Sequence, residues 1–276
     1  MAYTEPTLLA GMVRSTILSH PGLMSRITLV PNGTRTAPNK IAVPVVQRPS
    51  TAVQTITGAL LTPDEDNLIQ TLTCADKGDR ISWPASLYNT VKTDPGRIPL
   101  LTEAYTDHLR IAMEVALHAL LDTGTVTGSL ATDNTFTIAE FMAGVASILS
   151  YGADITDLTF VTGVAGFASL VTNGLANAGG TLVNGNRING MVGLFQGSPI
   201  PIIVSQNVTI SGATSGTAGH LFARQGVIGA ITDVNVSGPA EFGPAGNTIE
   251  MAFNAAYAFG FTEGTGGTLT YKFINP

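Results

Sequence analysis

The residues that could do chemistry are concentrated in one helical stretch, Leu100–Leu121, which carries two histidines and three acidic side chains. A carboxylate beside a histidine can act as a general acid–base pair or bind a metal ion. His108 and His118 are ten residues apart, however, and point about 80° away from each other at 3.6 residues per turn. We therefore predict that they do not form one site. Glu114 and His118, four residues apart, are predicted to form a surface or interface pair.

Other chemical motifs are incomplete. Gly163-Val-Ala-Gly166 lacks the full glycine spacing of a nucleotide loop, and the sequence contains no GxSxG or Walker motif. Asn207-Val-Thr and Asn235-Val-Ser match a glycosylation pattern, which we interpret as chance because no secretion signal precedes them. The single cysteine, Cys74, excludes internal disulfides and thiolate metal clusters and is predicted to be a small buried side chain. We predict no catalytic, cofactor-binding or metal-binding residues and no enzyme activity.

The composition indicates a protein that hides apolar surface against other subunits. Of 276 residues only 12% are charged, about half the usual ~25%, and the mean hydropathy is +0.29. No apolar run approaches the ~18–20 residues of a membrane span, so we expect no membrane association. The net charge of −6 argues against a protein that grips nucleic-acid phosphates with a basic face.

The helix over Leu100–Leu121 is predicted to be a spine about 30 Å long. Thr102 is its expected N-cap, and Gly124 is expected to take a left-handed conformation past its end. Its polar residues form one stripe: Glu103, Asp107, Arg110, Glu114, His118 and Asp122. Apolar residues cover two further sides, Tyr105, Leu109, Ala112, Met113, Ala116 and Leu120 on one and Ile111, Val115 and Ala119 on the other. So wide an apolar surface predicts a helix covered on most sides.

The chain before the spine is predicted to be an arm followed by a projecting hairpin. Thr7–Ser19 has the pattern of a short amphipathic helix, in a segment with too few residues for a core of its own. Lys40–Val46 is predicted to be a strand and Ile69–Ile81 a returning strand, interrupted at Lys77-Gly78. The isolated hydrophobic residues of the intervening Arg48–Asn67 favour a projected β-hairpin over a free linker.

The chain after the spine is predicted to form an α/β layer and then further strands. A helix over Thr137–Ser150 begins with a capping box of Thr137 and Glu140 and ends at Gly152. The layer continues as a buried strand Leu158–Thr162, a helix Val164–Thr172, and strands Met191–Gln196 and Ile200–Ser205. The last predicted strands lie within Leu221–Val236, Asn247–Phe261 and Gly267–Ile274. We expect the spine to cover these last strands in one domain, interrupted by an insertion at about Gly128–Gly219.

Taken in order, several segments resemble the major capsid protein of tailed bacteriophages, which has the Hong Kong 97-like (HK97-like) fold. They are Ile41-Ala-Val-Pro-Val, Arg80-Ile-Ser-Trp, Leu87-Tyr-Asn, Thr102–Gly124, Thr137–Gly152, Asp157–Thr162, Val164–Leu170, Gly197–Ser205, Tyr257–Phe261 and Leu269–Ile274. The resemblance covers nearly the whole chain. No segment is decisive alone, since the family has no invariant chemical motif, but the order and spacing agree.

The resemblance implies an α+β fold with four parts. These are an N-terminal arm (1–39), an extended β-hairpin loop or E-loop (40–82), a peripheral domain (83–127 and 220–276, with a spine helix at 100–122) and an axial domain (128–219). It also implies a coat protein that self-assembles, as pentamers and hexamers, into the icosahedral head of a tailed phage. Such a shell encloses double-stranded DNA without sequence-specific binding, uses no cofactor, and belongs to the virion after assembly in the host cytoplasm. Scaffolding and portal proteins are expected partners, and a decoration protein is a further one.

One departure from the family concerns the contacts between subunits. Some relatives cross-link through a lysine in the extended loop, but Gln47–Gln70 contains none, so we expect non-covalent contacts. The acidic cluster Asp64, Glu65 and Asp66 could meet basic residues of a neighbour or of its arm, although a solvated turn is an equally open interpretation. The candidate contact residues are Arg14, Arg26, Arg35, Arg48, Asp64, Glu65 and Asp66.

Two alternatives stay open at this point. An encapsulin-type shell around cargo enzymes shares the fold, and neighbouring genes would separate the two. From a different class, the Gly/Thr-rich β content could belong to a phage tail protein or adhesin. Those proteins usually show repeats and lack a long spine helix.

Overall fold

The computed structural model describes residues 22–30, 34–37, 40–44, 69–84, 97–173, 191–194, 200–205, 208, 216–242, 248–262 and 267–276, and the statements below concern these residues. The predicted arm helix Thr7–Ser19 and the hairpin Arg48–Asn67 lie outside them. Within these ranges no helix is long and apolar enough to cross a membrane.

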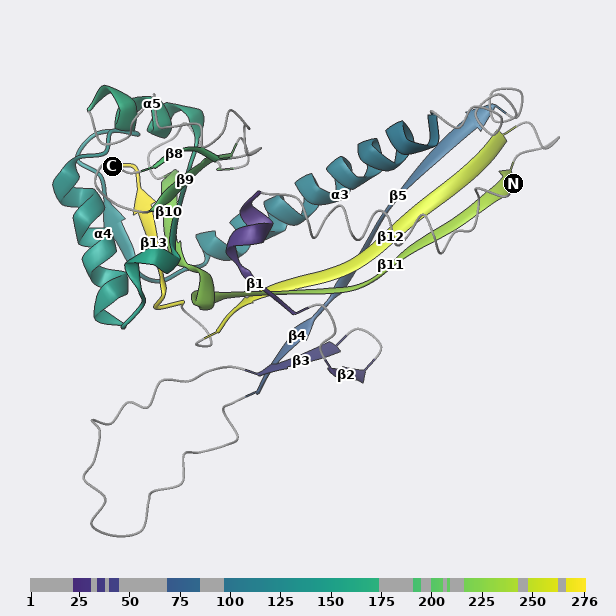
Figure 1. Ribbon diagram of the computed structural model, residues 1–276, viewed down its shortest axis with the longest axis horizontal. Helices are drawn as coiled ribbons and strands as arrows, with labels where there is room; N and C mark the ends of the chain where they lie inside the picture. Colours follow the sequence, from purple (N-terminus) through teal and green to yellow (C-terminus); the bar gives the residue numbers. More distant parts are fainter. Residues whose placement is uncertain are drawn as a thin grey trace, which may run out of the picture.

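The thirteen strands form three sheets, and three α-helices pack on or beside them (Figure 1). The helices are α3 (Arg97–Asp122), α4 (Ile138–Ser150) and α5 (Val164–Thr172), with short 3-10 turns η1 (Leu23–Arg26), η3 (Ile155–Asp157) and η5 (Arg224–Gly226). The strands are β1 (Thr28–Val30), β2 (Thr34–Ala37), β3 (Lys40–Pro44), β4 (Ile69–Thr73), β5 (Ala75–Pro84), β6 (Thr127–Ser129), β7 (Leu158–Thr162), β8 (Met191–Leu194), β9 (Pro201–Val204), β10 (Thr217–Ala223), β11 (Val227–Phe242), β12 (Thr248–Phe261) and β13 (Thr270–Ile274).

The first unit is elongated: α3 lies along a sheet of order β1-β11-β12-β5 (Figure 1). Leu109, Met113 and Leu117 of α3 are buried in one core with Tyr257 and Phe261 of β12. The predicted spine over a β-sheet is therefore confirmed. This face removes the apolar stripe of the helix from water, which is the main favourable term in its packing.

The opposite side of the spine contradicts the prediction that the helix is covered on most sides. Ile111 and Val115 are 43% and 49% exposed, and Ala119 is exposed as well. The four-stranded sheet, the six-stranded sheet and the short turn η1 all pack on the buried side of the helix, so this single chain leaves a second apolar stripe in water.

The ends of α3 also differ from the prediction. The helix begins at Arg97, so Thr102 lies inside it and is not its N-cap. Pro99 falls in the first turn, where a backbone N–H has no intrahelical partner to lose. At the other end Gly124 does not adopt a positive φ. Space there is tight instead, because an added Cβ would lie 3.0 Å from Thr270 Oγ1 and 3.1 Å from the Leu121 carbonyl oxygen.

The second unit contains a six-stranded sheet of order β6-β13-β10-β7-β9-β8 with α4 and α5 on one face. Its core is centred on four fully buried rings, Phe136, Phe141, Phe160 and Phe273. Edge-to-face pairs join most of them, with centroids 5.2–5.7 Å apart. The predicted α/β layer with a core of its own is confirmed.

The final strand corrects our grouping of the C-terminal strands with the spine. β13 pairs antiparallel with β10 and parallel with β6, inside the six-stranded sheet. The reason is Phe273, whose ring completes the aromatic core of that unit and contacts neither α3 nor its sheet. Only β11 and β12 of the C-terminal strands lie with the spine.

Two predicted strand segments each divide into two strands that pair in different sheets. Leu221–Val236 is divided at η5, where β10 leaves the six-stranded sheet and β11 enters the long one. Ile69–Ile81 breaks at Cys74 and not at Lys77-Gly78, because β4 pairs with β3 whereas β5 pairs with β12. Cys74 itself is buried, as predicted.

The capping box at the start of α4 is confirmed. The Glu140 backbone N–H donates to Thr137 Oγ1 at 3.3 Å, and the Thr137 backbone N–H donates to Glu140 Oε2 at 2.9 Å. Gly152 ends the helix with φ +79°, and its N–H donates to the Leu149 carbonyl at 2.7 Å. A left-handed residue in this place is a usual helix terminator.

Candidate functional site

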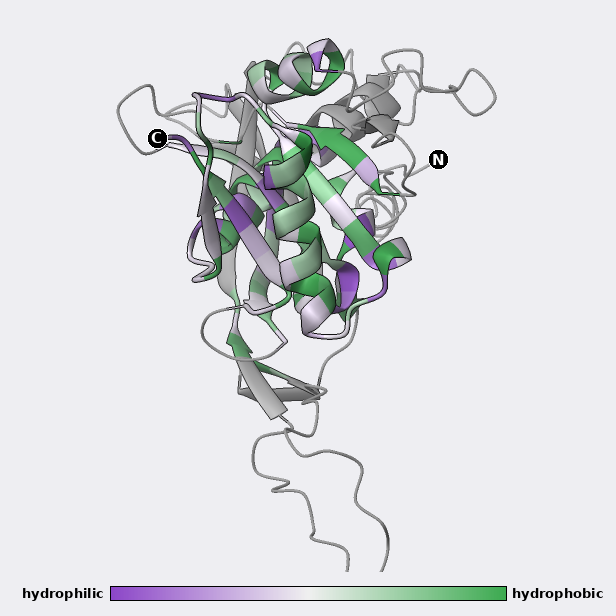
Figure 2. Ribbon diagram, turned by 90° about the vertical axis from the view of Figure 1, so that its left-hand side faces the viewer, coloured by the Kyte–Doolittle hydropathy of each residue, from purple (hydrophilic) through white to green (hydrophobic). Residues whose placement is uncertain are grey.

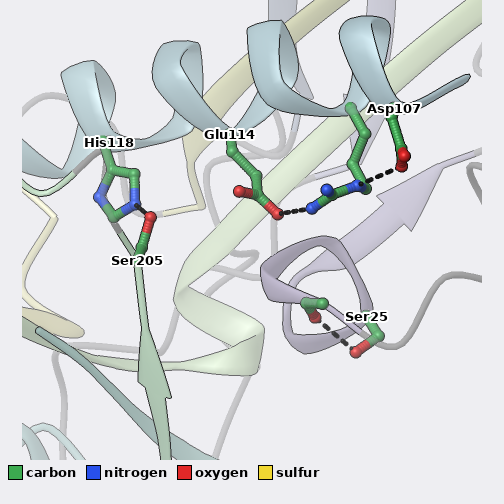
Figure 3. A network of polar contacts seen from close by, with 7 residues as sticks. Ser25, Asp107, Glu114, His118 and Ser205 are labelled. Carbon is green, nitrogen blue, oxygen red and sulfur yellow. Dashed lines mark hydrogen bonds and ion pairs between the residues drawn. The ribbon is translucent and has the colours of Figure 1, made fainter. Parts of the chain in front are cut away.

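A buried polar cluster lies where the C-terminal end of α3 meets the six-stranded sheet. His118 is only 2% exposed, and its Nε2 lies 3.1 Å from Ser205 Oγ (Figure 3). The prediction that Glu114 and His118 form a surface pair is therefore wrong. Glu114 instead accepts a 2.9 Å hydrogen bond from Arg110 Nη1, one turn earlier on the helix (Figure 3).

The sheet contributes the second half of the cluster. His220 Nε2 of β10 lies 3.3 Å from Asp122 Oδ1, and the two histidine rings are 6.0 Å apart, centroid to centroid. Thr217 Oγ1 donates to the same Asp122 oxygen at 2.8 Å. Lys272 Nζ donates at 2.7 Å to the Asp122 main-chain carbonyl, at the negative end of the helix dipole.

The alternation of the strands explains why histidine and lysine share this face. His220 pairs directly with Lys272 on one side and with Val161 on the other, so all three point toward α3. The neighbouring residues Phe160 and Phe273 point to the opposite face and form the α4–α5 core. This sheet is therefore buried on both faces, which is why all five residues of β7 are buried.

Burial determines the electrostatics of the cluster. Desolvation, followed by the nearby His220, lowers the pKa of His118 to about 4, and Asp122 offsets this only in part. For Asp122 burial raises the pKa, but the hydrogen bonds from His220 and Thr217 outweigh it and the pKa is lowered. At neutral pH the cluster therefore holds an ionised Asp122 beside a neutral His118.

The cluster does not have the arrangement of a catalytic site. A serine hydroxyl beside a histidine can act as nucleophile and base, provided a third group orients the histidine. His118 Nδ1 has no hydrogen-bond partner within the described part of the chain, and Asp122 bonds His220 instead. Ser205 and His118 are also 7% and 2% exposed, too little for a substrate to reach. Among the described residues, no group of three or more His, Cys, Asp or Glu could hold a metal ion.

The predicted contact residues fall mostly outside the described ranges. Arg14, Arg48, Asp64, Glu65 and Asp66 lie outside them, and Arg35 is described only as a backbone position in β2. Their role stays a prediction.

Arg26 is the predicted contact residue that the structure describes most fully. It lies half-buried at the end of η1, and its pKa is lowered by desolvation and by the positive charge of Arg224. Arg224 was missed because the two are distant in the sequence. The parallel pairing of β1 with β11 brings them together, and Thr28 Oγ1 donates to the Arg224 carbonyl at 3.2 Å.

A second surface of interest is the outer side of α4. Ile138 and Met142 are 63% and 46% exposed, one turn apart, and Ala139, Ala143 and Ala146 are exposed beside them. The only charged residue of this helix, Glu140, is used in the capping box. Figure 2 views the molecule from the end at which α4 lies. This outer face therefore offers apolar area without charge.

Comparison with known proteins shows the fold. No known family and no curated protein matches the sequence. The virus-like particle of Pyrococcus furiosus matches with a TM-score of 0.61 at 12% identity, covering 98% of this chain and 99% of that one. The capsid of an empty GTA particle matches with a TM-score of 0.60 at 12% identity, covering 92% of this chain and 90% of that one. The capsid of the Myoviridae phage XM1 matches with a TM-score of 0.55 at 11% identity, covering 92% of this chain and 91% of that one. The predicted HK97-like α+β fold is confirmed.

Proposed function

We propose that this chain is a major capsid protein, many copies of which assemble into an icosahedral shell around double-stranded DNA in the head of a tailed phage. The observation that carries the proposal is the end-to-end match, 98% of this chain against 99% of the Pyrococcus furiosus particle protein. In a shell protein the whole chain is needed to tile a surface, whereas an enzyme that reuses a fold needs only its site.

The exposed apolar surfaces support contacts between copies. A monomer that leaves Ile111 and Val115 of α3 and Ile138 and Met142 of α4 in water loses the free energy of their burial, roughly 25 cal/mol per Å². Large apolar side chains grouped on uncharged helix faces are typical of subunit interfaces. Few charges also reduce repulsion among many identical neighbours.

The proposal includes the parts that the resemblance implies. The four-stranded sheet and α3 correspond to the peripheral domain, and the unit of α4 and α5 to the axial domain around the five-fold and six-fold axes. We also propose that the copies assemble as pentamers and hexamers in the host cytoplasm. A separate scaffolding protein, a portal and a decoration protein are the proposed partners. We propose no enzymatic activity, and DNA would be enclosed without sequence-specific contacts.

We further propose that the acidic residues Asp64, Glu65 and Asp66 of one copy meet arginines of a neighbour. Arg26 is the best supported of these because Arg224 lies beside it and the two positive charges repel each other.

The first test is the mass and shape of the recombinant full-length chain, by light scattering and negative-stain microscopy. Closed shells, or rings of five and six copies, with or without a co-expressed scaffolding protein, are the expected result. A chain that stays monomeric and well folded in both conditions would overturn the proposal. Nuclease-protected DNA inside native particles separates a phage head from an encapsulin-type cargo shell, which would hold protein instead.

A charge exchange tests the contact itself. Arg26→Glu should reduce assembly, and combining it with Asp64→Lys, Glu65→Lys and Asp66→Lys should restore part of the yield. Lys40→Glu serves as a control for net charge, because Lys40 is exposed on a different sheet. Equal losses for Arg26→Glu and the control, with no recovery in the combined variant, would refute this pairing.

A further inference from the structure

The polar cluster between α3 and the six-stranded sheet has a feature that neither stability nor shell formation requires. Two buried histidines lie 6.0 Å apart across the interface, one from each element: His220 bonds the Asp122 carboxylate, and His118 bonds the Ser205 hydroxyl. Around them Leu117 and Leu121 of α3 pack with Phe222 of β10 in one core. A leucine or phenylalanine at either histidine would fill such an interface without polar atoms to satisfy.

The hydrogen bonds fix how many protons the cluster accommodates. His220 Nε2 faces Asp122 Oδ1, so His220 donates its proton to an ionised carboxylate. His118 Nε2 faces the Ser205 hydroxyl, and the tautomer that leaves no N–H without a partner has its proton on Nε2. A second proton on His118 would sit on Nδ1, which is buried and has no acceptor among the described residues.

The charged groups around the cluster come from three elements. They are Asp122 from α3, His220 from β10 and Lys272 from β13, while β7 and β9 contribute apolar Val161 and Ile203. Among the described residues of the cluster only Asp122 is negative, and it already accepts from His220 and Thr217. A positive charge on His118 would therefore face the nearby His220 imidazole, and the Asp122 carboxylate, already hydrogen-bonded to His220 and Thr217, would offset it only in part.

We infer that this joint is a proton-sensitive coupling: protonation of His118 loosens the contact between the spine helix and the six-stranded sheet while each unit keeps its own core. The inference is independent of the proposed function. It concerns the joint in a single chain, whether or not copies assemble.

The physical basis is the difference between the buried and the open joint. When α3 separates from β10, His118 enters water and regains its ordinary proton affinity, so acid favours the open form. Acid should open the joint without unfolding the six-stranded unit, because the aromatic core of α4, α5 and β13 contains none of these titratable groups. The core between α3 and β12 is likewise apolar at Leu109 and Met113.

Hydrogen exchange of the full-length chain between pH 7 and pH 5 tests the inference, with rates corrected for the intrinsic effect of pH. With a His118 pKa of about 4 in the closed joint and 6.5 in the open one, the opening constant should rise about 20-fold over this range. The rise should appear in the last turn of α3, which loses its packing when the joint opens, and not in the β11–β12 pairing. Light scattering ensures that all samples have the same assembly state.

The matched variants are His118→Gln and His108→Gln. Glutamine keeps a donor for Ser205 but does not titrate, so His118→Gln should flatten the pH dependence in the last turn of α3. His108 is exposed on the same helix, and its variant should behave as the wild type. A 20-fold rise that persists in His118→Gln, or one that is equal in β11 and β12, overturns the inference. If His118→Gln does not fold, an opening constant in the last turn of wild-type α3 that rises less than about twofold between pH 7 and 5 overturns it equally.

Discussion

Replacing Phe273 by alanine should destabilise the six-stranded unit far more than an average core substitution. The ring is 1% exposed and lies against Phe136, Phe160 and Tyr271, with centroids 5.4, 5.7 and 4.9 Å away. It also stacks on Phe141 at 6.2 Å. A Phe→Ala change in a core costs about 3–5 kcal/mol, and each lost ring pair adds about 0.5–1.5 kcal/mol, not additively. We therefore expect the upper part of that range, about 4–5 kcal/mol.

The assay is equilibrium unfolding in denaturant, followed by far-UV circular dichroism and by hydrogen exchange of the unassembled chain. Phe167→Ala is the matched control, because Phe167 packs on the same core but is only partly buried. It should lose about 1–2 kcal/mol. Faster exchange after Phe273→Ala should be found in β7 and β10. A loss no larger than that of Phe167→Ala, or exchange that rises in β11 and β12 instead, would refute the assignment of β13 to this core.

A coupled substitution examines the same contact from the other side. A Cβ on Gly144 would lie 2.8 Å from Phe273 Cζ and 3.1 Å from Tyr271 Cδ1. Gly144→Ala should therefore destabilise the wild type by about 1–3 kcal/mol through overpacking, despite the better helix propensity of alanine. In a Phe273→Leu background, which lacks Cζ, the same change should lose much less. Strictly additive effects in the two backgrounds would contradict this contact.

Three shorter predictions follow from other parts of the fold. Thr137→Ala should lower the free energy of unfolding by about 1 kcal/mol through loss of the capping box, and Thr137→Ser should be nearly neutral in the same denaturation assay. Gly219→Ala should destabilise the chain by about 1–3 kcal/mol, because its Cβ would lie 2.8 Å from the Val161 carbonyl oxygen, which the sheet holds in place; an unchanged midpoint would contradict that contact. The pKa of His118 is lower in the folded chain than its ordinary 6.5, so the unfolded chain takes up this proton first as pH falls. Stability present above pH 6.5 is thus lost toward pH 4, by about 2 kcal/mol at pH 5, and denaturation of His118→Gln at both pH values should show most of that loss removed.

The local pattern of the sequence was sufficient for several elements. The capping box at Thr137 and Glu140 and the terminating Gly152 depend on residues within one or two helical turns, so the sequence alone identifies them. The short run Leu158–Thr162, rich in β-branched and aromatic residues, was likewise predicted to be a buried strand, and all five of its residues are buried. Because the order of such segments also matches across nearly the whole chain, the HK97-like fold was predictable.

What only the tertiary structure determined involves partners distant in the sequence. Phe273 lies in a strand that shows the alternation of any half-buried strand. Nothing local indicates that it packs against three phenylalanines, one each from α4, β7 and the loop before α4. His118 lies in the polar stripe of the spine, and its burial depends on β10 and Ser205, 87 residues further on. A helical period shows which residues share a face, but not which element covers it. That depends on long-range strand pairing, here the placement of β10 between β13 and β7, which brings the second histidine to the end of the spine.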